Sequence, residues 1–196
     1  MTDNDPGETR QKWDNIYRNA DYGEHEAVRV LTENRHLLPE SGRALEVACG
    51  RGANALLLAR HGLDVDAWDI SAVVIEQLNT RAREQELAIR ATVRDVVNEP
   101  PDVASYDVVV VSHFLDRALF PALRDALKPD GLLCYQTFTR SRVSDSGPGN
   151  PEYRLADNEL LALCRGMQVL VYREEGRYGN VKQGLRDVAM IIASRR

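Results

Sequence analysis

Short apolar runs and amphipathic stretches alternate along the middle of the chain. The apolar runs, which we predict as strands, cover residues 44–47, 63–68, 88–93, 106–111 and 132–138. The stretches with apolar positions at helical spacing, which we predict as helices, cover residues 53–62, 72–86 and 117–127. Continuous β-branched runs are typical of strands that are buried on both faces of a sheet. The alternation therefore predicts right-handed βαβ units on a parallel sheet, which is an α/β fold.

Both ends of the chain depart from this alternation. Residues 8–20 and 26–38 have apolar positions at helical spacing, so two helices are expected before the first strand. Near the other end, a predicted helix over 157–165 precedes two strands, 168–174 and 188–194, with no helix between them. Strands joined without a crossover helix form an antiparallel pair, which we place at the edge of the sheet.

A glycine turn between the first strand and the first helix of the alternating region points to a ligand. Residues 45–52 read Leu-Glu-Val-Ala-Cys-Gly-Arg-Gly. Gly50 and Gly52 let a ligand approach the backbone closely, and the helix behind them offers free N–H groups. The second strand ends at Asp69, a carboxylate that can accept hydrogen bonds from ribose hydroxyls. These residues predict a bound nucleoside.

The glycines alone leave the kind of nucleoside open. Residues 50–55 also satisfy the looser dinucleotide pattern GxGxx(G/A). Glu46, in the strand before the turn, would repel a pyrophosphate and suits a ligand that carries an ammonium or sulfonium group. In the alternative interpretation, this is a tight strand-to-helix turn that Glu46 caps.

Four segments together resemble the class I S-adenosylmethionine-dependent methyltransferases. They are the turn at 46–52, Asp69, Arg94-Asp95 after the third strand, and Leu127-Lys-Pro-Asp-Gly131 before the fifth. The resemblance covers about residues 40–196. It implies a Rossmann-like, seven-stranded, mostly parallel sheet of order 3-2-1-4-5-7-6 with an antiparallel C-terminal hairpin, and a ligand across the carboxyl ends of the strands.

The resemblance also implies S-adenosyl-L-methionine as cofactor and S-adenosyl-L-homocysteine as product. It places the methionine part along the turn, the ribose on Asp69, and the adenine on Asp95 and Val96. Ala48 stands where the family has its first glycine, and its small side chain should still allow close approach. The predicted cofactor-binding residues are Tyr17, Glu46, Ala48, Gly50, Gly52, Asp69, Ile70, Asp95, Val96 and Ser112.

Shorter pieces resemble the small tellurite-resistance and thiopurine methyltransferase-like group. They are Trp13-Asp-Asn-Ile-Tyr17, Val65–Asp69, 147–153 and the stretch from 175 to 186. The resemblance implies a small-molecule methyl acceptor: a chalcogen oxyanion, a thiol or a small heterocycle. Residues 1–39 are then a helical appendage that covers the cofactor site, and 40–196 form a single methyltransferase domain.

Transfer from an activated methyl group mainly requires alignment of the acceptor and exclusion of water. A hydroxyl or amine acceptor would need a general base, and His113 at the end of the fourth strand is the candidate. Its alternative role is packing against the cofactor. Guanidinium forks suit an oxyanion or carboxylate, so Arg177 and Arg186, which the resemblance reaches, are the predicted acceptor-binding pair. The alternative for each is a solvated surface arginine. We interpret residues 139–154, a long loop rich in Gly and Pro, as a substrate-side lid.

Composition narrows the possible partners and location. The net charge is −5, from 25 basic and 30 acidic residues, and no block of Lys and Arg suggests a nucleic-acid partner. Three cysteines without metal-ligand spacing predict reduced thiols and no metal site. A polar N-terminus and the lack of an apolar run of about 20 residues predict a cytoplasmic protein without membrane contact. We expect a monomer or homodimer.

Two alternatives to the methyltransferase remain open from the residues alone. The first is an NAD(P)-dependent oxidoreductase, which would leave Glu46 unexplained. The second is a non-catalytic regulatory protein that binds an adenosyl ligand. A complete acceptor pocket would distinguish an enzyme from the second alternative.

Overall fold

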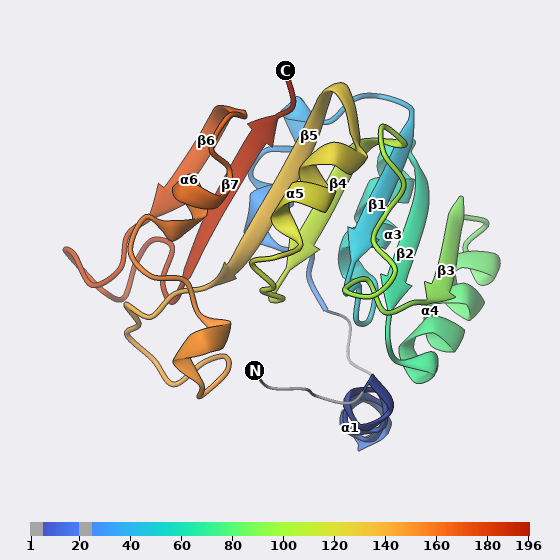
Figure 1. The fold of residues 1–196 in the computed structure, drawn as a ribbon. Coiled ribbons are helices and arrows are strands. Elements are labelled where there is room, and N and C mark those ends of the chain that lie inside the picture. The colour runs from blue at the N-terminus through green and yellow to red at the C-terminus, as the bar shows by residue number, and fades with distance from the viewer. Residues whose placement is uncertain (1–5, 20–24) are drawn as a thin grey trace.

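Seven strands form one sheet in the order β3-β2-β1-β4-β5-β7-β6 (Figure 1). The computed structural model describes residues 6–19 and 25–196. The strands are β1 (Arg43–Val47), β2 (Asp64–Asp69), β3 (Ile89–Val93), β4 (Tyr106–Ser112), β5 (Leu127–Phe138), β6 (Gln168–Glu174) and β7 (Val188–Ser194). The pairs among β1 to β5 are parallel, and β7 runs antiparallel to both β5 and β6. The predicted strand order and the predicted antiparallel hairpin are confirmed.

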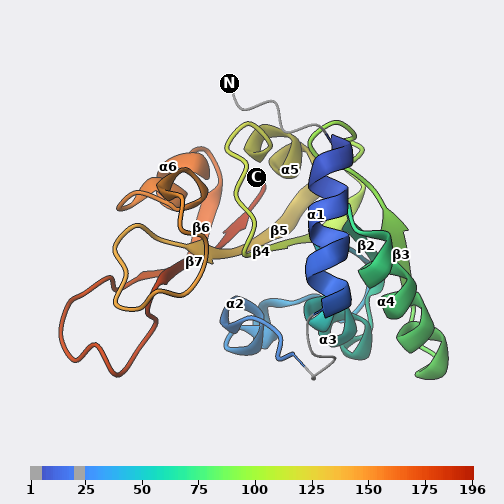
Figure 2. The ribbon, with the colours of Figure 1, turned by 90° about the horizontal axis from the view of Figure 1, so that it is seen from below.

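Helices cover both faces of this sheet. They are α1 (Pro6–Asn19), α2 (Arg29–Thr32), α3 (Ala53–His61), α4 (Ala72–Glu84), α5 (Phe120–Ala126) and α6 (Glu159–Leu163). Figure 2 looks onto the carboxyl ends of the parallel strands, with α2, α3 and α4 on one side of the sheet and α5 and α6 on the other. In the same view α1 lies across the strand ends. None of the described helices is long and apolar enough to cross a membrane.

Strand β4 shows why the sheet is buried on both faces. Val108 and Val110 belong to the apolar cluster under α2, α3 and α4, whereas Val109 and Val111 belong to the cluster under α5 and α6. All four side chains have no exposed surface. A strand that packs against an apolar cluster on each face must be apolar at every position. The β-branched run of β4 predicted this burial on both faces.

The predicted helix over 26–38 is wrong. Only α2 and a 3₁₀ turn, Arg35–Leu37, are helical there. The Val28 amide donates to the Asn54 side chain (2.9 Å), and the Val30 amide donates to that of Gln136 (3.0 Å). Val30 and Leu31 are buried in the core. The amides of Val28 and Val30 therefore donate to side chains of α3 and the sheet, whereas in a longer helix the backbone amides would point along the helix axis.

Other predicted boundaries shift at polar side chains and turns. The helices expected over 117–127 and 157–165 shorten to α5 and α6. The Asp116 carboxylate accepts from the amides of Ala118 (2.9 Å) and Leu119 (3.2 Å), which holds a turn before α5. Strand β5 begins at Leu127 instead of residue 132, because Leu127 already pairs with Tyr106 before a register shift. Residue 20 of the first predicted helix lies outside the described residues.

Candidate cofactor site

The turn after β1 has a left-handed backbone at three positions. Ala48, Gly50 and Gly52 have φ values of 51°, 50° and 74°. The turn is held to β2, because the Cys49 amide donates to the Trp68 carbonyl (2.9 Å) and the Gly50 amide donates to the Asp69 carboxylate (2.8 Å). The positive φ values explain the glycines, since most side chains are strained there. Ala48 tolerates the same conformation at a cost.

Glu46 lies entirely inside the protein and binds the start of α3. Its carboxylate accepts from the Ala55 amide and from the Asn54 side chain, both at 2.8 Å. Gly52, the residue before α3, has no side chain that could cap the helix, so Glu46 supplies the cap. Burial raises the pKa of Glu46 to about 8. These are the contacts of the alternative interpretation, the capped turn, and cofactor binding by Glu46 stays a prediction.

Asn54 connects the ends of β1 and β4. Besides Glu46, its side-chain amide donates to the Ser112 hydroxyl at 3.0 Å. Asn54 is buried. Adjacent strands whose chain connections leave in opposite directions form the crevice where α/β folds bind ligands. Sequence reasoning chose Ser112 and Glu46 but missed Asn54, whose position in the first turn of α3 was its only signal.

Asp69 is buried beside the turn. Its carboxylate accepts from the amides of Gly50 (2.8 Å) and Ser71 (2.9 Å). Burial raises its pKa, and the hydrogen bonds from Ser71, Gly50 and Ile70 oppose that rise. A buried carboxylate with raised pKa favours a ligand that brings hydrogen-bond donors or positive charge. Asp69 and Ile70 therefore lie at the turn, as the cofactor prediction requires.

Helix α1 covers the turn with Tyr17 and binds α4 with Asp14. The Tyr17 hydroxyl would lie 3.1 Å from a Cβ placed on Gly50. Burial and the nearby Asp69 raise the pKa of Tyr17. The Asp14 carboxylate accepts from the Ser71 hydroxyl (2.5 Å), and the Val73 amide lies 3.5 Å from it. Sequence reasoning named Tyr17 in this segment and missed Asp14.

Asp95 and Val96 follow β3 at the carboxyl edge of the sheet, where the turn after β1 also lies. The Asp95 carboxylate accepts from the Val97 amide (3.1 Å) and the Asn98 side chain (2.7 Å), within its own turn. Val96 is buried in the cluster that contains Trp68. The Arg94 guanidinium lies over the Trp68 ring at 3.9 Å. Adenine binding by Asp95 and Val96 stays a prediction.

His113 follows β4 with a left-handed backbone, at φ 54°. Its amide donates to the Gln136 carbonyl (2.9 Å), and its ring stacks on Phe138 with centroids 4.9 Å apart. The residue is exposed, but partial burial of the imidazole still lowers its pKa, which favours the neutral ring. Backbone strain in a non-glycine residue is often found at functional sites. His113 and Ala48 show it directly after the two strands that flank the crevice.

The predicted acceptor-binding arginines lie in the segment before β7 and contact backbone carbonyls. Arg186 donates to Gln183 (2.6 Å), Gly176 (2.9 Å) and Asn180 (3.0 Å) through its three nitrogens. Arg177 donates to the Arg142 carbonyl through Nε at 2.9 Å. The structure therefore shows loop contacts for both residues, and their binding of an acceptor stays a prediction.

The predicted lid is tied down by two buried charged residues. Arg154 donates to the carbonyls of Pro148 (2.7 Å), Thr139 (2.9 Å) and Ser146. Asp187 accepts from the Ser144 hydroxyl (2.5 Å). The burial of Arg154 depends on the folded loop and leaves no local signal in the sequence.

Residues 44–131 match the family described as methyltransferase domain. This part of the chain is therefore similar to methyltransferase domains. The chain is 32% identical over 124 residues to malonyl-[acyl-carrier protein] O-methyltransferase of Halalkalibacterium halodurans, covering 58% of this chain and 46% of the relative. It is 28% identical over 138 residues to the probable S-adenosyl-L-methionine-dependent methyltransferase TehB of Haemophilus influenzae, covering 67% and 48%. The chain thus spans about half the length of these curated relatives.

Solved structures share the fold of the methyltransferase domain. TehB from Haemophilus influenzae superposes with a TM-score of 0.71 at 20% identity, covering 94% of this chain and 67% of that one. A SAM-dependent methyltransferase from Aquifex aeolicus superposes with a TM-score of 0.67 at 17% identity, covering 98% and 99%. Together with the family match, these findings confirm the resemblance to class I S-adenosylmethionine-dependent methyltransferases and to the TehB group.

Proposed function

We propose that this chain transfers the methyl group of S-adenosylmethionine to a small acceptor that reacts through a thiol or the ring nitrogen of a heterocycle. The observation that carries the choice of acceptor is His113, a neutral imidazole in a strained conformation at the end of β4. A neutral imidazole accepts a proton, and both a thiol and a ring N–H have one to lose.

The residues around the turn fit the proposed cofactor. A Cβ on Gly50 would meet only the Tyr17 side chain, so the turn presents bare backbone beneath Tyr17. Glu46 and Asp69 are two buried carboxylates with raised pKa values beside this backbone. Such a site favours a ligand that is cationic and rich in hydroxyl donors. Asp69 would accept from the ribose, and Glu46 would favour the positive charge.

The reaction is a single displacement. The acceptor forms a bond to the sulfonium methyl, the sulfur–methyl bond breaks, and S-adenosylhomocysteine keeps that electron pair. His113 takes the proton that the acceptor loses. Tyr17 covers the turn and limits the access of water, which would otherwise compete for the methyl group. Phe138 holds the imidazole plane through the stacking contact.

The engaged arginines support an uncharged acceptor over an oxyanion. All three guanidinium nitrogens of Arg186, and all three of Arg154, donate to backbone carbonyls. An anion would have to displace these contacts. A chalcogen oxyanion is the second candidate because of Arg177, which is exposed and donates to the Arg142 carbonyl through Nε.

Replacement of His113 tests the proposed base. We expect His113→Gln to lower kcat about 10²- to 10⁴-fold without changing cofactor affinity, because it removes the proton acceptor. Activity of the unaltered protein should rise with pH through the lowered pKa of His113 and then level off. The control is His36→Gln, an exposed histidine in the 3₁₀ turn. Steady-state rates over pH 5–9 with a panel of thiols and heterocycles provide the measurement.

Three results would contradict this proposal. Turnover of tellurite or selenite, but of no thiol or heterocycle, would assign the chain to oxyanion methylation. Titration calorimetry with S-adenosylmethionine, S-adenosylhomocysteine and NAD(H) tests the cofactor separately. Binding of NAD(H) alone would overturn the methyltransferase, whereas binding of the adenosyl ligands without turnover of any acceptor would favour a regulatory binding protein.

A further inference from the structure

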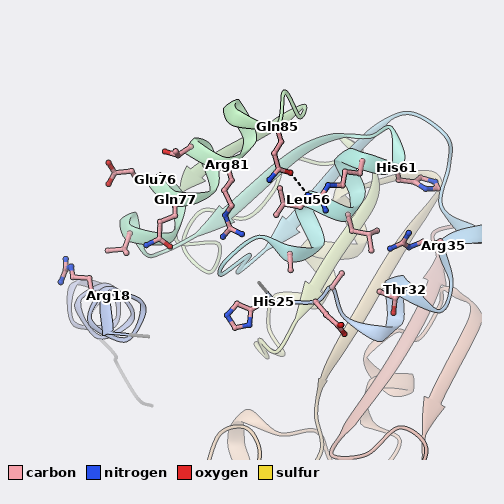
Figure 3. A pocket seen from close by; sticks show the side chains of 17 residues that line it. Arg18, His25, Thr32, Arg35, Leu56, His61, Glu76, Gln77, Arg81 and Gln85 are labelled. Carbon is pink, nitrogen blue, oxygen red and sulfur yellow. Dashed lines mark hydrogen bonds between the residues drawn. The ribbon is translucent and has the colours of Figure 1, made fainter. Parts of the chain in front are cut away.

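A second concave site lies behind the cofactor turn. It is an open groove of about 1210 Å³, and α1, α3, α4 and the segment around α2 line it (Figure 3). Ala53, the first residue of α3, and Val73, in the first turn of α4, both line the groove. The groove is separate from the residues proposed to hold the nucleoside, since none of them lines it.

The groove is basic in an acidic protein. Among the described residues, its lining includes Arg18, Arg35, Arg60 and Arg81 and two carboxylates, Glu26 and Glu76. With histidines neutral, these side chains sum to +2, against −5 for the whole chain. Figure 3 shows Arg35 and Arg81 on opposite sides of the groove, with Arg18 at its α1 end.

Three of these arginines have no carboxylate partner in the described part of the chain. Arg35, Arg60 and Arg81 form no ion pair there, whereas many other arginines do, such as Arg43 with Asp66 (2.8 Å). Arg60 donates to the Gln85 side chain (2.6 Å), which is neutral. Guanidinium groups from three separate elements that line one groove without ion-pair partners of their own suit an anion with several negative groups.

Two contacts connect the groove to the cofactor site. Arg81 donates to the Arg51 carbonyl (3.0 Å), in the middle of the glycine turn. Arg18 lies 3.8 Å from the Asp14 carboxylate, which binds the start of α4 and so holds α1 in place. An anion that contacts both Arg18 and Arg81 would therefore restrain both α1 and the glycine turn.

We propose that this groove binds a small polyanion with two or more phosphate-like groups, and that its binding strengthens cofactor binding. The anion would restrain α1 and the turn in the arrangement that encloses the nucleoside. Because coupling between two sites is reciprocal, the cofactor would strengthen anion binding by the same factor.

The binding test uses inorganic tripolyphosphate without divalent cations, followed by titration calorimetry. We expect saturable binding that weakens as salt is added, and weaker binding of orthophosphate. The variant Arg35→Gln/Arg60→Gln, which leaves the cofactor turn untouched, should lose affinity at least about tenfold. The matched control Arg90→Gln/Arg165→Gln removes two arginines outside the groove and should bind as the unaltered protein does. Thermal unfolding verifies that all variants fold.

The coupling test titrates S-adenosylhomocysteine with and without saturating tripolyphosphate. We expect several-fold tighter binding with the anion, and loss of this difference in Arg81→Gln. No saturable tripolyphosphate binding, or equal affinity in the groove variant and its control, would overturn the site. An unchanged S-adenosylhomocysteine affinity would overturn the coupling. Displacement of tripolyphosphate by a single-stranded oligonucleotide would contradict the proposal that the ligand is a small polyanion.

The binding arm requires neither cofactor nor methyl transfer. Its failure therefore leaves the proposed methyltransferase intact, and failure to find an acceptor leaves the groove intact.

Discussion

Ala48 shows how a single backbone conformation defines the cofactor turn. Its φ of 51° belongs to the left-handed region, where a Cβ costs about 1–2 kcal/mol in an ordinary residue. The resemblance places a glycine here in related proteins, and the structure supplies the physical reason. The cost is accepted because the Cys49 and Gly50 amides must reach β2.

We expect Ala48→Gly to leave the free energy of unfolding unchanged or to raise it by up to about 1 kcal/mol. Relief of backbone strain stabilises the folded state, and the greater chain entropy of glycine in the unfolded state opposes this gain. Ala48→Val should lower it by about 2 kcal/mol or more, since β-branching worsens the strain. Ala44→Gly, in the regular part of β1, is the control and should destabilise. Urea unfolding is the measurement, and equal losses for both glycine variants would contradict the explanation.

At the scale of elements, α1 is held to the domain because its Asp14 caps another helix, α4. Ser71, which precedes α4, makes no side-chain cap of its own. Asp14 takes that place from α1, near the positive end of the α4 dipole. Trp13 and Ile16 on α1 remain exposed. Polar contacts at one helix end, more than buried apolar area, thus position α1 over the glycine turn.

Removal of this cap should release α1. We expect Asp14→Ala to destabilise the docking of α1 by about 1–2 kcal/mol, because it removes a charged cap. Amides of residues 6–19 should exchange faster with deuterium, while those of β4 should keep their protection. Gln11→Ala, an exposed change in α1, serves as the control. Unchanged exchange in α1 would show that Asp14 does not hold it.

For the whole molecule, buried carboxylates beside the glycine turn oppose folding at neutral pH. The pKa of Glu46 is raised to about 8 by burial, and that of Asp69 is raised for the same reason. A carboxyl group whose pKa is higher in the folded state stabilises the fold at low pH and loses that contribution as pH rises. Asp187 and Glu159, whose pKa values are lowered, act in the opposite direction at more acidic pH.

We expect the ligand-free protein to lose stability as pH rises from about 4.5 to 8, by on the order of 4 kcal/mol for Glu46. Glu46→Gln should flatten this slope. The amide nitrogen of the new side chain would face a hydrogen-bond donor, so the variant should also be less stable at every pH. Glu159→Gln, whose pKa shift has the opposite sign, should leave the slope in this window unchanged. Urea midpoints across the pH range are the measurement. An unaltered slope in Glu46→Gln would contradict the assignment.

Local pattern determined much of this protein. The β-branched run of β4, the alternation of strands and helices, and the glycine turn before α3 are short-range signals, since each depends on residues a few positions apart. They predicted the sheet and, with the family resemblance, its strand order. The positions of Gly50, Gly52 and Asp69 beside one another also follow from strand ends that meet at one edge of a parallel sheet.

Only the tertiary structure decided features in which distant residues compete for the same groups. Residues 26–38 do not form one helix because Asn54 and Gln136 bind the amides of Val28 and Val30. Arg186 binds loop carbonyls, and Asp14 caps a helix 57 residues away. Side-chain partners far apart in the chain leave no periodic trace in the sequence, because hydrogen bonding depends on distance in space. The basic groove arises in the same way, from arginines on separate elements that folding brings to one face.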